Sequence, residues 1–248
     1  MKKVALITGS SRGIGAATAL RLASEGYAIC VNCVKDQKLA DEVVAGITAL
    51  GSNAIAIQAD VSVEDDVKRL FEAIDREMGQ LDVLVNNAGI LMPQIRVESM
   101  TAERINRILT TNVTGYFLCS REAVKRMSTK HAGTGGVIVN VSSAAARLGS
   151  GGEYVDYAAS KGAIDTFTIG LATEVAAEGI RVNGVRPGFI YTDIHADGGE
   201  PDRVDRIKHQ LPLRRGGQAK EVAAAIAWLV SDESSYTTGA FIEVSGGR

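Results

Sequence analysis

The sequence predicts an α/β fold, a single doubly wound domain in which helices flank both faces of a seven-stranded parallel sheet. Short apolar runs alternate along the chain with longer amphipathic stretches. The apolar runs are continuous, which is typical of strands that are covered on both faces. Glycine is abundant, with 27 residues against 4 prolines, and this composition suits tight turns between strands and helices.

Length and charge limit the class of protein. The chain has 248 residues, 46% of them apolar, and a formal net charge of −2, which are ordinary values for a globular protein. We expect one domain over residues 1–248, long enough to bury a substantial core. The near-neutral charge gives no reason to expect a nucleic acid or a membrane surface as partner. No apolar run approaches the ~20 residues that span a bilayer.

Cysteines and histidines are few. Cys30, Cys33 and Cys119 cannot form a disulfide framework, and the first two lie in an expected strand. Buried thiols in a reducing cytoplasm are therefore a better interpretation than a redox or metal site. The chain has three histidines and no HExxH pattern, so no metal site is expected.

The apolar and amphipathic runs place the individual elements. Strands are expected at residues 3–8, 27–34, 54–58, 81–85, 136–141, 180–185 and 240–244. Helices are expected at residues 13–25, 37–50, 62–78, 101–129, 155–178 and 219–230. Ser62-Val63-Glu64-Asp65 predicts a capping box at the start of the third helix, and Gly79 suits the glycine position after its end.

Residues 189–215 form the one long irregular stretch. Loops of this length in a compact domain are usually functional, so we predict a lid over a substrate, with an ordinary surface insertion as the alternative. Its polar side chains would suit a sugar, while its apolar residues would suit an acyl chain. The polar residues are Tyr191, Asp193, His195, Glu200 and Arg203.

A glycine-rich loop follows the first strand directly. Glycines allow a tight turn and a close approach of the backbone to a pyrophosphate. The helix that follows presents free N–H groups and its positive dipole end to the anion. The sequence therefore predicts a dinucleotide site in the loop Thr8-Gly9-Ser10-Ser11-Arg12-Gly13-Ile14-Gly15, with contacts from Gly9, Ser11, Arg12, Gly13, Ile14 and Gly15.

The end of the second strand distinguishes the two nicotinamide dinucleotides. An acidic residue there would bind the ribose hydroxyl of NAD, but the chain has Asn32-Cys33-Val34-Lys35. Arg12 and Lys35 could bind a 2′-phosphate through charge-assisted hydrogen bonds, so the sequence favours NADP(H) over NAD(H). Asp36 opposes this prediction. We interpret it as the N-cap of the next helix, but a shift of one turn would bring it to the ribose.

Tyr157 and Lys161 are four residues apart, so both lie on one face of an expected helix. A cation about 4 Å away stabilises a phenolate by roughly 4 kcal/mol at an effective dielectric constant of about 20. Even half of that energy lowers the pKa of the tyrosine by more than about one unit. The pair predicts a tyrosine that exchanges protons near neutral pH.

Two serines, Ser142 and Ser143, follow the expected strand at 136–141. In doubly wound folds ligands bind at the carboxyl ends of the strands. A hydroxyl group at this position can donate a hydrogen bond to a substrate carbonyl, while capping of a helix or turn is the alternative interpretation.

The order of these motifs resembles that of classical short-chain dehydrogenases/reductases. The resemblance covers nearly the whole chain and is strongest to bacterial glucose-dehydrogenase-like and 3-oxoacyl-carrier-protein-reductase-like members. The motifs that carry it are Thr8 to Gly15, Asn86-Asn87-Ala88-Gly89, Asn112, Ser142-Ser143, Tyr157 with Lys161, and Pro187-Gly188.

The resemblance implies four catalytic residues. Tyr157 would be the general acid in reduction and the base in oxidation. Lys161 would lower its pKa and bind the nicotinamide ribose, and Ser143 would polarise the carbonyl oxygen. Asn112 would brace a helix and hold a water that links Lys161 to solvent.

The resemblance also implies further contacts to the cofactor. Asp60 and Val61 would touch the adenine, although capping of the next helix is an equally good interpretation of these residues. The other implied contacts are Asn32, Asn86, Ala88, Gly89, Pro187, Gly188, Ile190 and Thr192.

The sequence departs from the family pattern in two places. Between Ser143 and Tyr157 there are 13 residues, one more than in many members. The extra residue is expected in Gly151-Gly152-Glu153-Tyr154; alternatively, Ser142 is the working serine. Ser245 stands where members often have aspartate before Gly-Gly, which bears on subunit packing.

The predicted function is reversible hydride transfer between NADP(H) and a small-molecule carbonyl or secondary alcohol. One alternative is an NAD-preferring sugar or polyol dehydrogenase. Another, from a different class, is a non-catalytic nucleotide-sensing regulator, which would not need the intact Ser143, Tyr157 and Lys161. The resemblance also implies a homotetramer, with the helices at 101–129 and 155–178 in one interface.

Overall fold

A parallel sheet forms the centre of the molecule, and the computed structural model describes residues 2–248 of the chain. The strands of this sheet are β1 (Val4–Ile7), β2 (Ala28–Cys33), β3 (Ala54–Gln58), β4 (Leu81–Asn86), β5 (Gly136–Val141), β6 (Ile180–Pro187) and β9 (Phe241–Val244). They are ordered β3-β2-β1-β4-β5-β6-β9, and every pairing is parallel. All seven expected strands are therefore confirmed, with bounds that differ by at most two residues.

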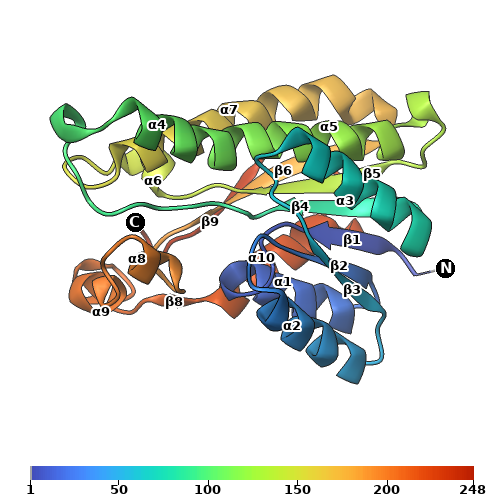
Figure 1. Cartoon of the computed structure of the whole chain (residues 1–248), viewed down its shortest axis with the longest axis horizontal. Coiled ribbons are helices and arrows are strands. Elements are labelled where there is room, and N and C mark those ends of the chain that lie inside the picture. The colour runs from blue at the N-terminus through green and yellow to red at the C-terminus, as the bar shows by residue number, and fades with distance from the viewer. Residues whose placement is uncertain (1) are drawn as a thin grey trace.

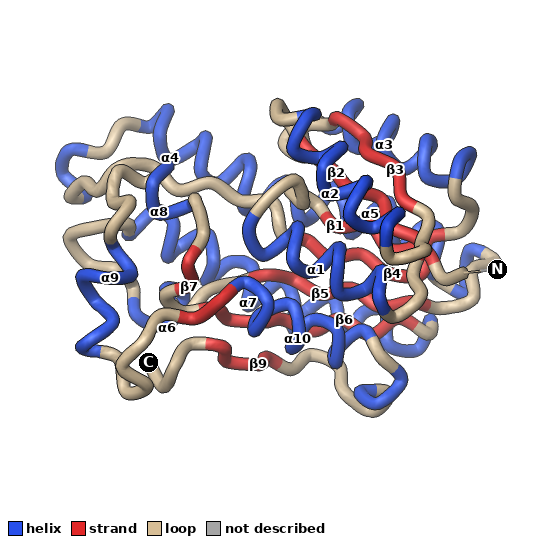
Figure 2. Tube along the Cα trace, turned by 90° about the horizontal axis from the view of Figure 1, so that it is seen from below, coloured by secondary structure: helices blue, strands red, loops and turns tan. Residues whose placement is uncertain are grey.

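Helices cover both faces of the sheet, as Figures 1 and 2 show. The longer helices are α1 (Gly13–Ser24), α2 (Gln37–Ala49), α3 (Glu64–Glu77), α4 (Ala102–Leu109), α5 (Gly115–Met127), α7 (Val155–Val175) and α10 (Ala219–Val230). One layer contains α1, α2 and α10. The other contains α3, α5 and α7, with α4 in line with α5. The doubly wound class is thus confirmed.

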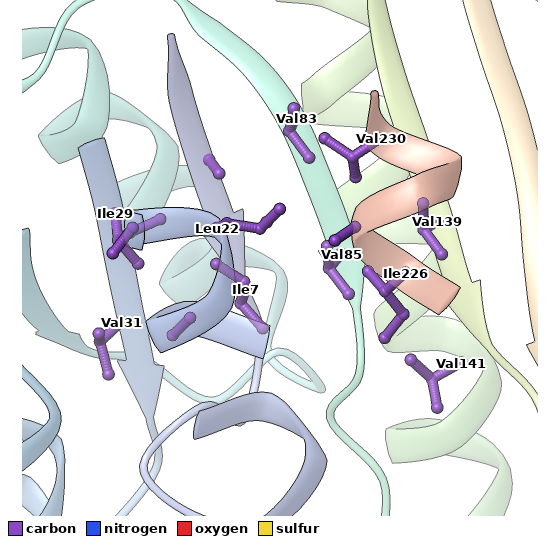
Figure 3. Packing of buried hydrophobic residues seen from close by; sticks show 14 of the residues in the cluster. Ile7, Leu22, Ile29, Val31, Val83, Val85, Val139, Val141, Ile226 and Val230 are labelled. Atoms are coloured by element: carbon purple, nitrogen blue, oxygen red, sulfur yellow. The ribbon is translucent and has the colours of Figure 1, made fainter. Parts of the chain in front are cut away.

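Alternate strand residues point into two separate cores. In β1, Ala5 and Ile7 pack under α1 and α10, while Val4 and Leu6 pack under α3, α5 and α7. Figure 3 shows Ile226 of α10 lying over the strands of the first core. Because both faces are buried, both sets of strand positions are apolar, which explains the continuous apolar runs in the sequence.

The helix expected at 101–129 is interrupted. It begins after Thr101, whose side chain accepts a hydrogen bond from the backbone N–H of Arg104 at 3.2 Å. Between α4 and α5 the chain forms a π-helical turn, Thr110–Thr114. Asn112 lies inside this turn with its side chain fully buried. Such turns often occur at functional sites.

The capping box predicted at Ser62 is wrong. The N-cap of α3 is Val63, and its side chain makes no capping bond. Asp60 instead accepts hydrogen bonds from the backbone N–H and the hydroxyl of Ser62, at 2.9 and 2.6 Å. A carboxylate two residues upstream thus takes the hydroxyl that the helix terminus would have used. The glycine after the helix is confirmed, since Gly79 has φ +92° and donates its N–H to Ile74 O at 3.1 Å.

The stretch at 189–215 is more ordered than expected. It contains β7 (Ile190–Tyr191), α8 (Ile194–Asp197) and α9 (Arg203–Ile207), and β7 pairs with β8 (Gly217–Gln218). These elements lie at the end of the molecule opposite the N-terminus (Figure 1). Another short helix, α6 (Ala145–Leu148), follows β5. No helix within residues 2–248 is long and apolar enough to cross a membrane.

Candidate active site

The turns after β1, β4, β5 and β6 converge on one cavity of about 970 Å³. They converge because the strands are parallel, so all their carboxyl ends lie at the same edge of the sheet. Residues 189–215 and the loop before α7 complete the wall of this cavity. Among the sequence-predicted residues, the cavity is lined by Gly9, Ser11, Arg12, Gly13, Ile14, Lys35, Asp60, Val61, Ala88, Gly89, Ser143, Tyr157, Lys161, Pro187, Gly188, Ile190 and Thr192.

The glycine-rich loop requires glycine for two different reasons. Gly9 and Gly13 have φ angles of +61° and +58°, which other residues rarely adopt. At Gly15 the reason is space: a Cβ atom would lie 2.6 Å from both Asn87 Nδ2 and Gly9 O. Gly15 does not line the cavity, so it acts by letting α1 approach the loop rather than by contacting a ligand.

Asn32 and Asn86 do not line the cavity, contrary to the expectation that they contact a cofactor. Asn32 Oδ1 accepts the N–H of Gly9 at 3.1 Å, and its Nδ2 donates to Ala59 O at 3.0 Å. Asn86 Nδ2 donates to Ser120 and Asn140 inside the sheet. Both side chains belong to strand residues that face inward, so they hold the protein together instead of facing the ligand.

The cations expected near a 2′-phosphate differ in their surroundings. Arg12 forms an ion pair with Asp197 of α8, with 2.6 Å between Nη2 and Oδ2. Lys35 is exposed and has no ion-pair partner within residues 2–248. Asp36 stands at the N-cap position of α2 as expected, but its side chain makes no capping bond. Asp36 also borders the cavity. The structure therefore keeps both Lys35, which favours NADP(H), and Asp36, which favours NAD(H), beside the expected ribose site.

The two serines after β5 have different environments. The Ser142 hydroxyl is buried and donates to Asp165 Oδ1 at 2.5 Å. The Ser143 hydroxyl accepts the N–H of Ala145 at 3.1 Å, and its polar interaction with Tyr157 lowers the pKa of that phenol. Both serines line the cavity, but only Ser143 influences the ionisation of the tyrosine.

Burial governs the ionisation of Tyr157 and Lys161. Burial raises the pKa of Tyr157, and only the hydrogen bond with Ser143 opposes it. Burial also lowers the pKa of Lys161 to about 7, against a smaller opposing effect of Asp165. Burial of both side chains thus outweighs any stabilisation of the phenolate by Lys161, so the pKa of Tyr157 is raised and not lowered as the sequence suggested.

The ammonium group of Lys161 is directed mainly at other atoms. Its Nζ donates to Val141 O at 2.8 Å and to Tyr116 Oη at 3.3 Å, and it lies 5.7 Å from the centre of the Tyr157 ring. Tyr116, on α5, donates in turn to Val141 O at 2.9 Å. These contacts fix Lys161 beside the tyrosine without a direct hydrogen bond between them.

Asn112 supports the wall of the cavity from behind. Its Oδ1 accepts the N–H of Ile90 at 2.8 Å, and its Nδ2 donates to Ile90 O at 3.0 Å and to Ser160 at 3.2 Å. A Cβ atom on Gly89 would lie 3.4 Å from Asn112 Oδ1 and 3.6 Å from Lys161 Nζ. Asn112 thus ties the segment after β4 to α7, close to Lys161.

Sequence reasoning missed three supporting residues. Asn87 lines the cavity, and its Nδ2 donates to Thr8 O and Gly9 O at 2.8 and 3.0 Å. The Thr8 hydroxyl accepts the N–H groups of Asn87 and Ala88. Strand alternation could have identified Asn87, since the last residue of β4 faces inward and the next one lies beyond the strand. Nothing in the sequence distinguishes the third, Tyr116, from other buried aromatic residues.

Comparison with known proteins defines the class of this protein. A family model described as enoyl-(acyl carrier protein) reductase matches residues 9–248. The chain belongs to the short-chain dehydrogenase/reductase family and is an oxidoreductase that acts on CH–OH groups.

Individual relatives cover almost the entire chain. It is 64% identical over 245 residues to "Uncharacterized oxidoreductase YgfF" of Escherichia coli (strain K12), covering 99% of each chain. It is 39% identical over 247 residues to the 3-oxoacyl-[acyl-carrier-protein] reductase FabG of Staphylococcus aureus (strain Mu50), covering 100% of this chain and 98% of the relative.

Solved structures agree with this membership. A short-chain dehydrogenase from Burkholderia cenocepacia J2315, in complex with NADP, superposes with a TM-score of 0.90 at 36% identity, covering 99% of this chain and 97% of that chain. The reductase LugOII, which catalyses keto-reduction at C1 during lugdunomycin biosynthesis, has a TM-score of 0.89 at 38% identity, covering 99% and 97%.

Substitution of Gly15 by alanine is expected to displace the glycine-rich loop. The added methyl group would overlap Asn87 and Gly9, at a cost of about 1–3 kcal/mol in unfolding free energy, and would weaken NADPH binding. Urea unfolding and a fluorescence titration with NADPH measure both effects. Gly162→Ala is the matched control, because its Cβ meets no atom within 4 Å. An unchanged NADPH affinity in Gly15→Ala would show that the loop tolerates the overlap.

Removal of the buried amine should stabilise the fold in a pH-dependent way. Because the pKa of Lys161 is lowered to about 7, the unfolded chain binds more protons above that pH, and wild-type stability rises with pH between about 7 and 10.5. Lys161→Met removes this dependence. We therefore expect its Tm, relative to the wild type, to be several degrees higher at about pH 6 than at about pH 9.5. A difference that is constant with pH, as expected for the exposed control Lys35→Met, would contradict the burial argument.

Proposed function

We propose that the protein catalyses reversible hydride transfer between NADP(H) and a small-molecule carbonyl compound or secondary alcohol. One observation carries the proposal: Ser143, Tyr157 and Lys161 line the same cavity as the glycine-rich loop. A proton donor, a polarising hydroxyl and a loop shaped for a pyrophosphate thus share one cavity. Family membership supports this reaction class.

The residues present fit a nicotinamide dinucleotide. Gly9 and Gly13 line the cavity without side chains at the start of α1, whose N-terminal N–H groups can bind phosphate. Gly188 could carry no side chain, because a Cβ atom there would lie 2.8 Å from Ser245 Cα. Asp60 and Val61 would border the adenine end, while Pro187, Gly188, Ile190 and Thr192 would border the nicotinamide end. When bound, the dinucleotide supplies or accepts the hydride.

Tyr157 would donate its phenolic proton to the carbonyl oxygen during reduction and take it back during oxidation. Its raised pKa keeps the phenol protonated at neutral pH, which suits the donor role. Ser143 would donate a hydrogen bond to the same oxygen and stabilise the charge that develops there. Lys161 would bind the ribose and, in its protonated form, favour the phenolate of Tyr157. Asn112 would keep the wall beside Lys161 in place.

The preference for NADP(H) rests on Lys35 and Arg12. Lys35 is exposed at the cavity rim and is available for a 2′-phosphate. Arg12 must leave Asp197 to join it, but an ion pair between half-exposed side chains contributes only about 0–1 kcal/mol. The NADP complex of a similar dehydrogenase supports this preference.

An NAD-preferring sugar or polyol dehydrogenase is the second candidate. Asp36 favours it, because its carboxylate borders the cavity without a capping bond and could bind the ribose hydroxyls.

A homotetramer and a cytoplasmic location remain predictions. The exposed faces of α5 and α7 carry Phe117 and Ile169, which are 49% and 53% exposed, and the Phe117 ring lies 4.0 Å from that of Phe167. Exposed apolar surface of this kind supports subunit contact through the two helices. The three cysteines are free and buried, and burial raises the pKa of the Cys119 thiol to about 12.

Replacement of Tyr157 by phenylalanine tests the reaction. NADPH consumption would be followed with ketoacyl thioesters, diketones, quinones, ketoses and aldehydes. General acid catalysis contributes about 10²- to 10⁴-fold, so we expect kcat to fall by that factor in Tyr157→Phe while NADPH binding persists. Tyr236→Phe, at the fully exposed surface, should retain full activity. Undiminished turnover by Tyr157→Phe would rule out the proposed acid.

Replacement of Lys35 by alanine tests the cofactor preference. Loss of a charge-assisted hydrogen bond of about 1.5–3 kcal/mol should weaken NADPH binding roughly ten- to hundredfold and leave NADH binding unchanged. Arg12→Ala should act in the same direction, and Lys38→Ala, outside the cavity, should have no effect. Calorimetric Kd values for both dinucleotides give the answer. A wild type that prefers NADH, with no response to either variant, would favour the second candidate.

A further inference from the structure

Arg203, at the start of α9, has an unused hydrogen-bond donor at the cavity. Its side chain is 7% exposed, and Nη2 donates to Glu153 Oε2 at 2.5 Å. Nη1 is buried and has no hydrogen-bond partner within residues 2–248. Since buried polar groups are nearly always paired, this donor points to an acceptor on a ligand.

The guanidinium group of Arg203 is held in place by its neighbours. It stacks over the rings of Tyr154 at 4.9 Å and Phe189 at 5.4 Å. The Glu153 carboxylate fixes its other edge. A side chain held on three sides cannot readily turn Nη1 toward solvent, so the donor is pre-oriented for whatever occupies the cavity.

His195, on α8, contributes an acceptor to the same cavity. Its Nε2 lies 3.0 Å from Ile190 O, and a carbonyl oxygen can only accept, so Nε2 carries the hydrogen. Burial lowers the pKa of His195, which favours the neutral ring. Its Nδ1 therefore has a free lone pair, and this buried atom has no partner in the described part of the chain.

These two groups share a cavity with the reacting residues. Glu153 and Tyr154 immediately precede α7, four and three residues before Tyr157. Tyr154 donates its hydroxyl to Gly198 O at 3.3 Å, which ties the segment after α8 to this loop. Glu153 belongs to the stretch in which the sequence has one residue more than many family members. Arg203 and His195 thus line the same cavity as Tyr157, and Arg203 is joined through Glu153 to the loop that leads into α7.

The chemistry of the pair favours a neutral hydroxyl group. A hydroxyl can accept from a donor such as Nη1 and donate to an acceptor such as Nδ1, so this one class of group matches the chemistry of both atoms. A carboxylate could accept from Arg203, but it has no proton for His195. Glu153 also balances the charge of Arg203, so the pair offers no net positive charge to an anion.

We propose that Arg203 and His195 form a subsite for a hydroxyl group that the substrate carries in addition to its reacting carbonyl. The inference rests on the proposed function and names its substrate class: hydroxy ketones in reduction and the corresponding diols or polyols in oxidation.

Matched substrates test this subsite. Methyl ketones of four, five and six carbons would be compared with the same ketones carrying a terminal hydroxyl, and with the keto acid levulinate. A site built to hydrogen-bond a hydroxyl discriminates strongly against an analogue that lacks it. We expect kcat/KM to be at least about tenfold higher for the hydroxy ketone at one or more chain lengths.

Two variants locate the source of that preference. Arg203→Met and His195→Phe should each bring the ratio for hydroxy ketone over plain ketone close to one, mainly by loss of turnover of the hydroxy ketone. A merely structural role would lower both rates alike and leave the ratio intact. Arg206→Met is the matched control, because that arginine is 54% exposed, and its ratio should equal that of the wild type.

Several results would overturn the proposal. They are equal rates for both ketone series at every length, an unchanged ratio in both variants, or a preference for levulinate that Arg203→Met removes. The last result would identify Arg203 as a receptor for carboxylates instead.

A binding measurement separates the subsite from the proposed function. NMR spectra record the ¹⁵N signals of the three histidine rings. The signals of His195 are identified as those that disappear in His195→Phe. The five-carbon hydroxy ketone should shift the Nδ1 signal, and the plain five-carbon ketone should not. If the wild type reduces no ketone with NADPH or NADH, the proposed function fails, and this signal alone then decides: the selective shift supports the subsite and its absence overturns it.

Discussion

The parallel register of the central sheet is the constraint on which the site depends. It places the carboxyl ends of β1, β4, β5 and β6 at one edge. Backbone hydrogen bonds extend this register beyond the strands, from Thr8 N to Val85 O, from Ser142 N to Val185 O and from Gly188 N to Val244 O. Each turn therefore starts at a fixed position relative to its neighbours, and groups more than a hundred residues apart in the chain reach the same cavity.

Desolvation is the second physical effect that shapes this site. The same burial keeps the phenol of Tyr157 protonated and reduces the charge on Lys161. It also makes every unpaired polar atom costly, so the contacts of Lys161 with Val141 O and Tyr116 are needed to hold the amine. Arg203 Nη1 and His195 Nδ1 lack such contacts although both residues line the cavity, and this combination makes them candidates for contact with a ligand.

Much of the fold could be predicted from local pattern. Continuous apolar runs identified all seven strands, because a strand buried on both faces has few polar positions. The predictions for individual helices were wrong where a side chain can hydrogen-bond to more than one partner. Ser62 bonds to Asp60 instead of capping α3, and the π-helical turn around Asn112 depends on Ile90, which no helical periodicity in the segment reveals.

The sequence by itself determined the doubly wound class, the glycine-rich loop and the spacing of Tyr157 and Lys161, because these depend on residues that are adjacent in the chain. Only the tertiary structure decided that Asn87 rather than Asn86 borders the cavity, and that the Ser142 hydroxyl is bonded to Asp165 while that of Ser143 is not. It alone set the direction of the pKa shift of Tyr157, and it alone brought Arg203 and His195 to the same cavity as Tyr157. The physical reason is the same in each case: orientation, burial and the choice of partner depend on segments that are distant in the chain and meet only when the sheet has formed.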